Sequence, residues 1–279
     1  MYDEAIKKIY AKLNTTCKKN LQAGHRTHLG ASIIGQRCQR AIWYSFRWVK
    51  APTFTGQTLR LFDRGHSEET KVYYWLKESG FEIEDDSSQK RIESRDGHFG
   101  GSCDGIIQAF PTEVGIQDPA LLEIKTSNKN AFEQLKKRGV QNAKWQHYVQ
   151  SQIYASKFDL PIILYICICK DNDEWYIEII NRRDDIALKY EELANNIINS
   201  PFPRPKISED PAYYLCKMCD YHNICHYNHS YQKNCRSCKY AQPIDGPDWY
   251  CHYHKEKIPE DVIPTGCSAW TEARQDETA

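Results

Sequence analysis

The first eighty residues place apolar side chains at helical spacing. In the opening segment these positions recur three and four residues apart: Ile6, Ile9, Tyr10 and Leu13. This spacing predicts an amphipathic helix over residues 1–20. Two further helices are expected over residues 32–49 and 58–77, because Pro52 and Gly80 follow them as stop signals.

From residue 81 onward the pattern changes to short segments with the alternation of β-strands. Strands are expected over four ranges: Phe81–Glu84, Arg91–Glu93, Ser102–Ala109 and Leu121–Lys125. The pairs Asp96-Gly97 and Gly100-Gly101 are turn-forming and are expected to separate these strands.

The second half of the chain returns to alternating helices and strands. Four elements are expected: a helix over 142–157, strands over 162–169 and 175–180, and a helix over 185–198 that ends before Pro201. Helices that bracket a mixed central sheet predict an α/β layered domain.

The composition changes sharply after Pro205. The chain has 279 residues, a length that suits one catalytic domain with a small appended module. Seven of its 12 cysteines lie in the last quarter, where periodic apolar residues are few. Such a segment must take its folding energy from bound metal. We therefore expect a catalytic domain over residues 1–228 and a metal-bound module over residues 229–279.

Charge and targeting features give limited information on the binding partner and the cellular compartment. Lys and Arg number 37, as do Asp and Glu, so overall charge neither favours nor excludes nucleic acid. The opening residues lack an apolar signal core, and the longest apolar run, residues 160–169, is shorter than the roughly 20 residues of a membrane span. A reducing cytoplasm is expected, where cysteines bind metal instead of forming disulfides.

A carboxylate and a lysine are expected to share one strand face at the end of an apolar run. In Leu121-Leu122-Glu123-Ile124-Lys125, the period of two puts Glu123 and Lys125 together and Ile124 opposite. Alone the triplet is weak evidence, since Glu69-Thr70-Lys71 has the same spacing on an expected helix.

Asp104 changes that assessment. It lies 19 residues before Glu123 in an expected strand flanked by glycines. If the two strands pair, two carboxylates can hold a hard divalent ion, Mg²⁺ or Mn²⁺, that polarises a phosphate and acidifies a bound water. Lys125 would orient that water or balance charge. The alternative is a set of surface charges at strand ends.

Two of the expected helices, over residues 58–77 and 142–157, carry further polar candidates for the site. His66 and Glu69 are three residues apart and so share a helix face; either could complete the metal shell. Gln146, Gln150 and Tyr154 form a second stripe that could bond phosphate or water. The alternative for each is a solvent-facing polar surface.

Together these residues resemble the PD-(D/E)XK nuclease superfamily, in its RecB-like branch. They are most similar to the iron–sulfur exonucleases of CRISPR adaptation and their phage relatives. The matching pieces span residues 29–226 and come in this order: Leu29-Gly-Ala-Ser32, Cys38-Gln-Arg40-Ala-Ile-Trp43-Tyr44, Arg64-Gly65-His66 with Glu69, Gly101 to Asp104, Glu123-Ile-Lys125, Gln150-Ser-Gln-Ile-Tyr154, and Cys216-Lys-Met-Cys219 with Cys225.

The resemblance implies a restriction-endonuclease-like core and a role for each matching residue. Asp104, Glu123 and the backbone carbonyl of Ile124 would bind Mg²⁺ or Mn²⁺, Lys125 would be the catalytic lysine, and the accessory motif would be Gln150 and Tyr154. Because His66 follows the motif glycine directly, where many relatives have the histidine a few residues later, both His66 and Glu69 stay open as the outer ligand.

The first cysteine set supplies three thiolates on a short loop, Cys216, Cys219 and Cys225. The family pattern implies Cys38 as the fourth. Four thiolates suit either zinc or a 4Fe–4S cluster. Their spacing alone favours zinc, and the resemblance favours iron–sulfur.

A second set has the spacing of a four-cysteine zinc site: Cys235, Cys238, Cys251 and Cys267. His252 and His254 are competing ligands. Nearby Trp249, Tyr250 and Trp270 could stack on unpaired bases, or they could form the small apolar core of this module.

The sequence therefore predicts a metal-dependent DNA exonuclease that acts on single strands or duplex ends in DNA processing or recombination, with a phage gene as one possible origin. A recombination or single-strand-binding protein is a possible partner. The alternatives are an endonuclease on the same core and a non-catalytic DNA-binding or adaptor protein that uses the zinc module.

Overall fold

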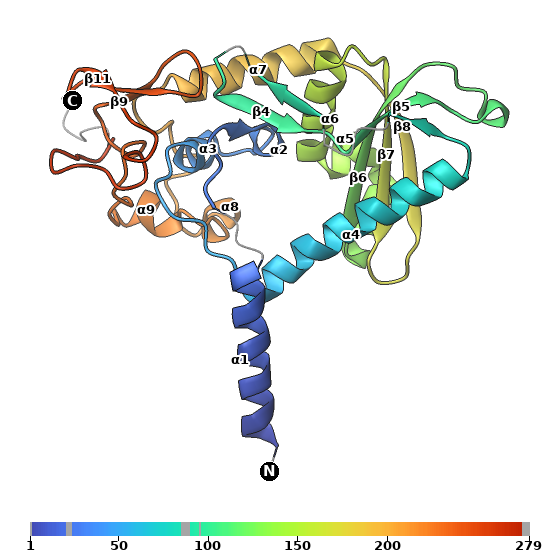
Figure 1. Ribbon diagram of the computed structural model, residues 1–279, viewed down its shortest axis with the longest axis horizontal. Coiled ribbons are helices and arrows are strands. Elements are labelled where there is room, and N and C mark those ends of the chain that lie inside the picture. Colours follow the sequence, from blue (N-terminus) through green and yellow to red (C-terminus); the bar gives the residue numbers. More distant parts are fainter. Residues whose placement is uncertain (1, 21–23, 85–89, 95, 275–279) are drawn as a thin grey trace.

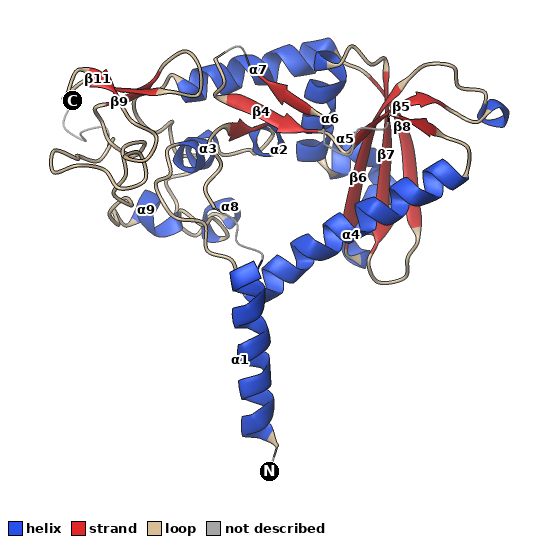
Figure 2. Cartoon of the chain, viewed as in Figure 1, coloured by secondary structure: helices blue, strands red, loops and turns tan. Residues whose placement is uncertain are grey.

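A mixed five-stranded sheet forms the centre of the computed structural model, which describes residues 2–20, 24–84, 90–94 and 96–274 (Figures 1 and 2). The strands lie in the order β2-β5-β6-β7-β8. Only β6 and β7 run parallel; the other neighbours are antiparallel. Their bounds are β2 (Glu82–Ile83), β5 (Gly105–Ala109), β6 (Ala120–Ser127), β7 (Ile162–Cys169) and β8 (Trp175–Asn181).

Helices cover both faces of this sheet, which confirms the α/β prediction. On one face, Val72 and Leu76 of α4 (Gly56–Glu78) pack with the buried side chains of β5, β6 and β7. On the other face, a larger buried cluster joins the sheet to α5 (Lys129–Ala143), α6 (Trp145–Lys157) and α7 (Asp184–Ile198). β7 is buried along its whole length between these layers, as its continuous apolar sequence requires.

The predicted strand over residues 102–109 is wrong as a single element. The chain forms β4 (Phe99–Ser102) and then, after a break at Cys103 and Asp104, β5. β4 belongs to a separate small sheet with β1 (Leu29–Gly30) and β3 (Arg91–Glu93), in the order β1-β4-β3. The pair Gly100-Gly101 is therefore part of a strand and not the predicted turn.

The predicted helix over residues 32–49 is likewise two helices, α2 (Ala31–Ile34) and α3 (Gln39–Phe46). The break falls at Gly35, where a side-chain carbon would lie 3.0 Å from the Cα atom of Gln146 on α6. The backbone at this break therefore packs directly on α6, where only glycine fits. The sequence also gave no sign of α5, whose backbone is kinked at Gly139 (φ 70°).

The first predicted helix is confirmed as α1 (Asp3–Asn20), which projects from the rest of the molecule (Figure 1). None of its residues is buried, and its apolar positions such as Ile9 face solvent. Its contact with α4 includes a hydrogen bond from Arg60 to Asn14 Oδ1 at 2.9 Å.

The C-terminal quarter has little regular structure. It contains the short helices α8 (Tyr214–Lys217) and α9 (His222–His226) and a small sheet of β9 (Ala241–Pro243), β10 (Trp249–Cys251) and β11 (Glu256–Lys257). Trp249 is 1% exposed and packs on Phe46 of α3, in the same buried cluster that covers the main sheet. Trp249 is therefore a core residue and is not available to stack on bases.

Candidate active site

Strand register brings Asp104 and Glu123 together. Gly105 of β5 pairs with Leu122 of β6 in an antiparallel ladder, so the preceding Asp104 stands opposite Glu123. The ladder ends here, and the Asp104 carboxylate accepts a hydrogen bond from the Ile124 amide at 2.6 Å. The side chain thus satisfies a backbone donor that the departing strand would otherwise leave unpaired.

Lys125 completes a compact ionic group on the same side of β6. Its Nζ lies 2.5 Å from Glu123 Oε1 and 3.5 Å from Asp104 Oδ2, and it donates to the Ile124 carbonyl at 3.1 Å. Burial lowers the pKa of Lys125, but the charges of Asp104 and Glu123 outweigh burial and raise the pKa above its usual value. The amine therefore stays protonated at neutral pH.

Glu123 is the most constrained member of the group. Its side chain is fully buried, and Oε2 has no hydrogen-bond partner among the described residues. Burial raises the carboxyl pKa to about 7; Lys125 opposes this shift and Asp104 adds to it. An unpaired buried carboxylate oxygen is costly unless a cation or a proton donor approaches it.

Glu69 of α4 is a third carboxylate in range of this group. Burial raises its pKa, and the charge of Asp104 adds to the shift. His66, one turn earlier, has Nδ1 3.4 Å from Glu69 Oε2, and its side chain is 72% exposed. Of the two candidates for an outer ligand, Glu69 thus interacts with the buried carboxylates and His66 contacts Glu69.

One face of α6 supplies buried polar groups beside the ionic cluster. Gln150 and Tyr154 are both buried. Burial, with the charge of Glu123, raises the pKa of Tyr154, so its hydroxyl stays protonated. A side-chain carbon at Gly101 of β4 would fall on that hydroxyl, so the glycine is what admits it. The third predicted member of the stripe, Gln146, instead donates to the Ser32 carbonyl at 3.0 Å.

His147 is a polar neighbour that the sequence did not indicate. Its Nδ1 lies 2.8 Å from the hydroxyl of Tyr165, the residue that pairs with Glu123 across β6 and β7. Burial, reinforced by the charge of Lys125, lowers the pKa of His147 to about 3. A neutral imidazole therefore stands behind the ionic group. The sequence could have indicated His147 through its spacing, because it lies three residues before Gln150 and seven before Tyr154 and so shares their helix face.

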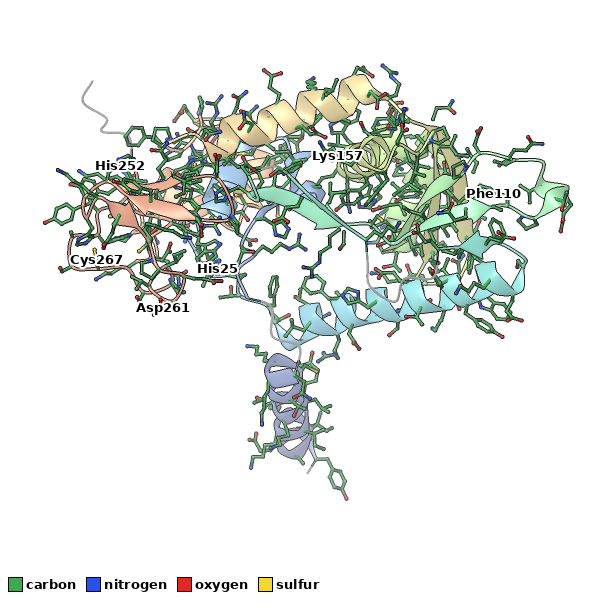
Figure 3. All side chains as sticks on the ribbon, turned by 45° about the horizontal axis from the view of Figure 1, so that its top comes forward. His25, Phe110, Lys157, His252, Asp261 and Cys267 are labelled. Atoms are coloured by element: carbon green, nitrogen blue, oxygen red, sulfur yellow. The ribbon has the colours of Figure 1, made fainter. Side chains whose placement is uncertain are left out.

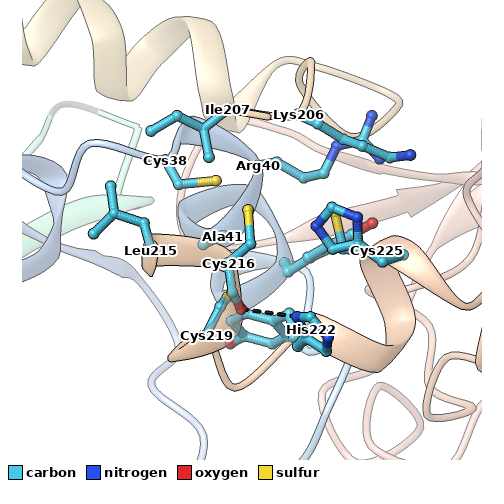
Figure 4. A pocket seen from close by; sticks show the side chains of 13 residues that line it. Cys38, Arg40, Ala41, Lys206, Ile207, Leu215, Cys216, Cys219, His222 and Cys225 are labelled. Carbon is cyan, nitrogen blue, oxygen red and sulfur yellow. Dashed lines mark hydrogen bonds between the residues drawn. The ribbon is translucent and has the colours of Figure 1, made fainter. Parts of the chain in front are cut away.

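The four cysteines of the first set lie together although Cys38 is far from the other three in the sequence. Cys38, at the start of α3, lines one pocket with Cys216, Cys219 and Cys225 (Figure 4). The basic side chains Arg40 and Lys206 line the same pocket, and Nδ1 of His222 donates a hydrogen bond to the Cys216 carbonyl at 2.9 Å.

The second cysteine set is also close together. Burial raises the pKa of Cys235 to about 11, and Cys267, Cys238 and Cys251 add to the shift, so all four sulfurs lie within electrostatic range. All eight cysteines of the two sets are free thiols. Within the described ranges, no group of three or more His, Cys, Asp or Glu side chains could hold a metal ion as it stands. Binding would require side chains to turn toward a shared ion.

The donor chemistry nevertheless fits the predicted metals. The ionic group offers carboxylate oxygens, the donors that Mg²⁺ and Mn²⁺ prefer, and Glu123 Oε2 lacks any protein partner in the described structure. The cysteine sets offer four sulfurs each, the donors of zinc and iron–sulfur sites.

Comparison with known proteins gives distant likenesses. No protein-family model and no curated protein matches the chain. Among solved structures it is similar to SSO0001, at 18% identity and a TM-score of 0.47 over 80% of this chain and 98% of that one. It is also similar to the alkaline exonuclease LHK-Exo of Laribacter hongkongensis, at 14% identity and a TM-score of 0.44 over 62% and 87% of the two chains. The complex of LHK-Exo with dAMP gives the same identity and score.

Likeness at this level assigns neither a family nor an activity to this chain. The resemblance to PD-(D/E)XK nucleases thus stays a prediction. None of the described helices has the length and apolar content needed to cross a bilayer.

Proposed function

We propose that this protein is a metal-dependent DNA nuclease of the exonuclease type, acting on DNA ends in DNA processing or recombination. The observation that carries the proposal is the ionic group of Asp104, Glu123 and Lys125, in which the fully buried Glu123 has one carboxylate oxygen without a partner among the described residues. Buried charges are costly, and a chain retains them where they bind or react.

Asp104, Glu123 and the Ile124 carbonyl would hold Mg²⁺ or Mn²⁺, with Glu69 as the outer ligand in preference to His66. The ion would act as a Lewis acid on the scissile phosphate and would lower the pKa of a bound water. Glu69 is favoured because burial and the charge of Asp104 both raise the pKa of its carboxyl, whereas His66 is mostly exposed.

Lys125 would act as a proton-bearing cation and not as a base. Its raised pKa keeps the amine charged at neutral pH, so it can donate a hydrogen bond to the attacking water or to a phosphate oxygen. Tyr154 and Gln150 would hold the DNA backbone or ordered water through their hydrogen-bonding groups. In the reaction the water oxygen bonds to phosphorus as the bond from phosphorus to a sugar oxygen breaks.

The cysteine sets would have a structural role. Cys38, Cys216, Cys219 and Cys225 would hold a 4Fe–4S cluster, or zinc, and so fasten α3 to the chain after α7. Cys235, Cys238, Cys251 and Cys267 would hold zinc within residues 229–279. Four-sulfur donor sets of this kind supply folding energy where regular structure is sparse.

Cleavage by site variants tests the proposal. Asp104→Ala and Lys125→Ala should each lose DNA cleavage in Mg²⁺ or Mn²⁺, by a hundredfold or more as an order of magnitude. Lys71→Ala is the matched control, because Lys71 has the same spacing from an acid but pairs with Glu68 on the exposed side of α4. Full activity in both site variants would refute the assignment.

The form of the DNA separates exonuclease from endonuclease. An exonuclease should degrade linear DNA and leave covalently closed circles intact. Cleavage of circles at a similar rate would favour the endonuclease alternative on the same core. DNA binding with no cleavage under any metal condition would favour the adaptor alternative.

A further inference from the structure

Two arginines lie in the core beside the C-terminal cysteines without an acidic partner. Arg47 and Arg236 are each 1% exposed. None of the ion pairs formed by the described residues includes either of them. Burying two like charges together is costly unless an anion is close.

Their immediate neighbours compensate only in part. Both guanidinium groups face the ring of Trp249, at 5.1 Å for Arg47 and 4.7 Å for Arg236. Arg47 donates to the carbonyls of Ala241 and Cys238 at 3.0 and 3.3 Å, and Arg236 to the Thr27 carbonyl at 2.9 Å. Rings and carbonyls are dipolar and carry no net charge, so two positive charges remain.

Backbone contacts also bring together the loops that carry the four cysteines of the second set. The Cys238 amide donates to the Cys235 carbonyl at 3.0 Å, as in a tight C-x₂-C turn. Ala241, which pairs with Cys251 across β9 and β10, also donates to the Cys238 carbonyl at 3.2 Å. A side-chain carbon at Gly266 would lie 3.4 Å from the backbone of Asn234, so the residues before Cys267 and Cys235 pack against each other.

The two competing histidines lie at the surface, and His252 is labelled in Figure 3. His252 and His254 are exposed, and His252 Nε2 lies 2.6 Å from Gln242 Oε1. The His254 backbone amide, in contrast, donates to Cys251 Sγ at 3.5 Å.

We propose that Cys235, Cys238, Cys251 and Cys267 bind one Zn²⁺ as an all-thiolate centre whose charge is balanced by the buried guanidinium groups of Arg47 and Arg236. Four thiolates and one Zn²⁺ carry a net charge of −2, which matches the two arginines. Four neutral thiols would leave both cations uncompensated, and a ligand set with one histidine would leave one. Arg47, hydrogen-bonded to the Cys238 carbonyl, is a positioning residue for this centre.

This inference rests on the zinc assigned above to the second cysteine set. Its tests do not involve DNA, so they stay interpretable if the nuclease assignment fails. Zinc analysis of the full chain should show that Cys251→Ala loses one zinc per chain, whereas Cys219→Ala loses only the metal of the first set. Equal zinc in the wild type and in Cys251→Ala would overturn the proposal.

X-ray absorption at the zinc edge tests the ligand set. The expected result is a sulfur shell at about 2.3 Å with no nitrogen shell at about 2.0–2.1 Å. The double variant His252→Ala, His254→Ala should give an unchanged spectrum. A nitrogen shell that disappears in the double variant would overturn the all-thiolate assignment.

Zinc transfer to a chelator tests the charge balance. Arg47→Met should speed zinc loss by about tenfold or more, since groups that support metal ligands typically contribute 10- to 100-fold in affinity. Arg47→Lys, which keeps the charge, should recover most of the loss. Ile42→Val perturbs the same buried cluster without a charge change and should transfer zinc at close to the wild-type rate. If Arg47→Met and Ile42→Val behave alike, the arginine acts through packing and the proposal is wrong.

Discussion

Glu123→Gln should stabilise the protein in the absence of added Mg²⁺ or Mn²⁺ while removing its proposed activity. Glu123 is fully buried, so its carboxylate must ionise away from water. Burial raises its pKa from 4.5 to about 7, against the attraction of Lys125 and with the added repulsion of Asp104. The folded protein therefore binds this proton more tightly than the unfolded chain does.

The sign of the pH dependence follows from that difference. Protonated Glu123 favours the folded state, so this contribution is fully present below the unfolded pKa and is lost as pH rises through the folded pKa of about 7. At about 1.4 kcal/mol for each pKa unit, the ionised carboxylate costs on the order of 3 kcal/mol above pH 7. Glutamine has the shape of the protonated acid and avoids this cost.

Urea unfolding followed by tryptophan fluorescence measures the effect. Near pH 8 the variant should exceed the wild type by about 3 kcal/mol, and near pH 4.5 the two should coincide. Glu192→Gln, at an exposed position on α7, is the matched control and should change nothing at either pH. Added Mn²⁺ should stabilise the wild type and not Glu123→Gln. A gain independent of pH, or a loss at every pH, would show that the carboxylate is not strained in the folded protein.

Three further results are expected. Gly101→Ala places a methyl group on the Tyr154 hydroxyl, so cleavage should fall about tenfold or more with little change in overall helix content, and full activity would show that Tyr154 is dispensable. Phe132→Ala empties a fully buried site on α5 and should cost about 3–5 kcal/mol in the free energy of unfolding; a cost below about 1 kcal/mol would contradict the packing described. Purified protein should be brown and contain iron, and Cys216→Ser should bleach it; colourless protein with zinc alone would replace the iron–sulfur cluster by zinc and leave the nuclease proposal intact.

The strands of the sheet and the site residues on them follow directly from local pattern. The apolar run of β7 and the alternation in Glu123-Ile124-Lys125 depend on burial of a strand face, which sequence records position by position. Asp104 was expected within a continuous strand. It lies instead at a break between two sheets, because its carboxylate replaces a backbone partner for Ile124.

The parts that sequence did not indicate depend on contacts between distant segments. Gly35 lies so close to Gln146 of α6 that a side chain would not fit, and no local signal in the sequence carries that information. His147 meets the hydroxyl of Tyr165 only because α6 packs on β7. The core role of Trp249 depends on Phe46 and Arg47, which lie about two hundred residues earlier in the chain. Spacing alone does not tell a core aromatic from one that stacks on bases.

The contact between α3 and the C-terminal segment has a consequence for synthesis of the chain. Arg47 reaches its hydrogen-bond partner Ala241 across 194 residues. At roughly 5–20 residues per second, the ribosome delivers that partner on the order of 10–40 seconds after α3 has emerged. Through this interval Phe46 and Trp48 lack the contacts with Trp249 and Arg236 that they have in the finished fold. The nascent chain therefore offers chaperones an aromatic surface that the finished protein does not have.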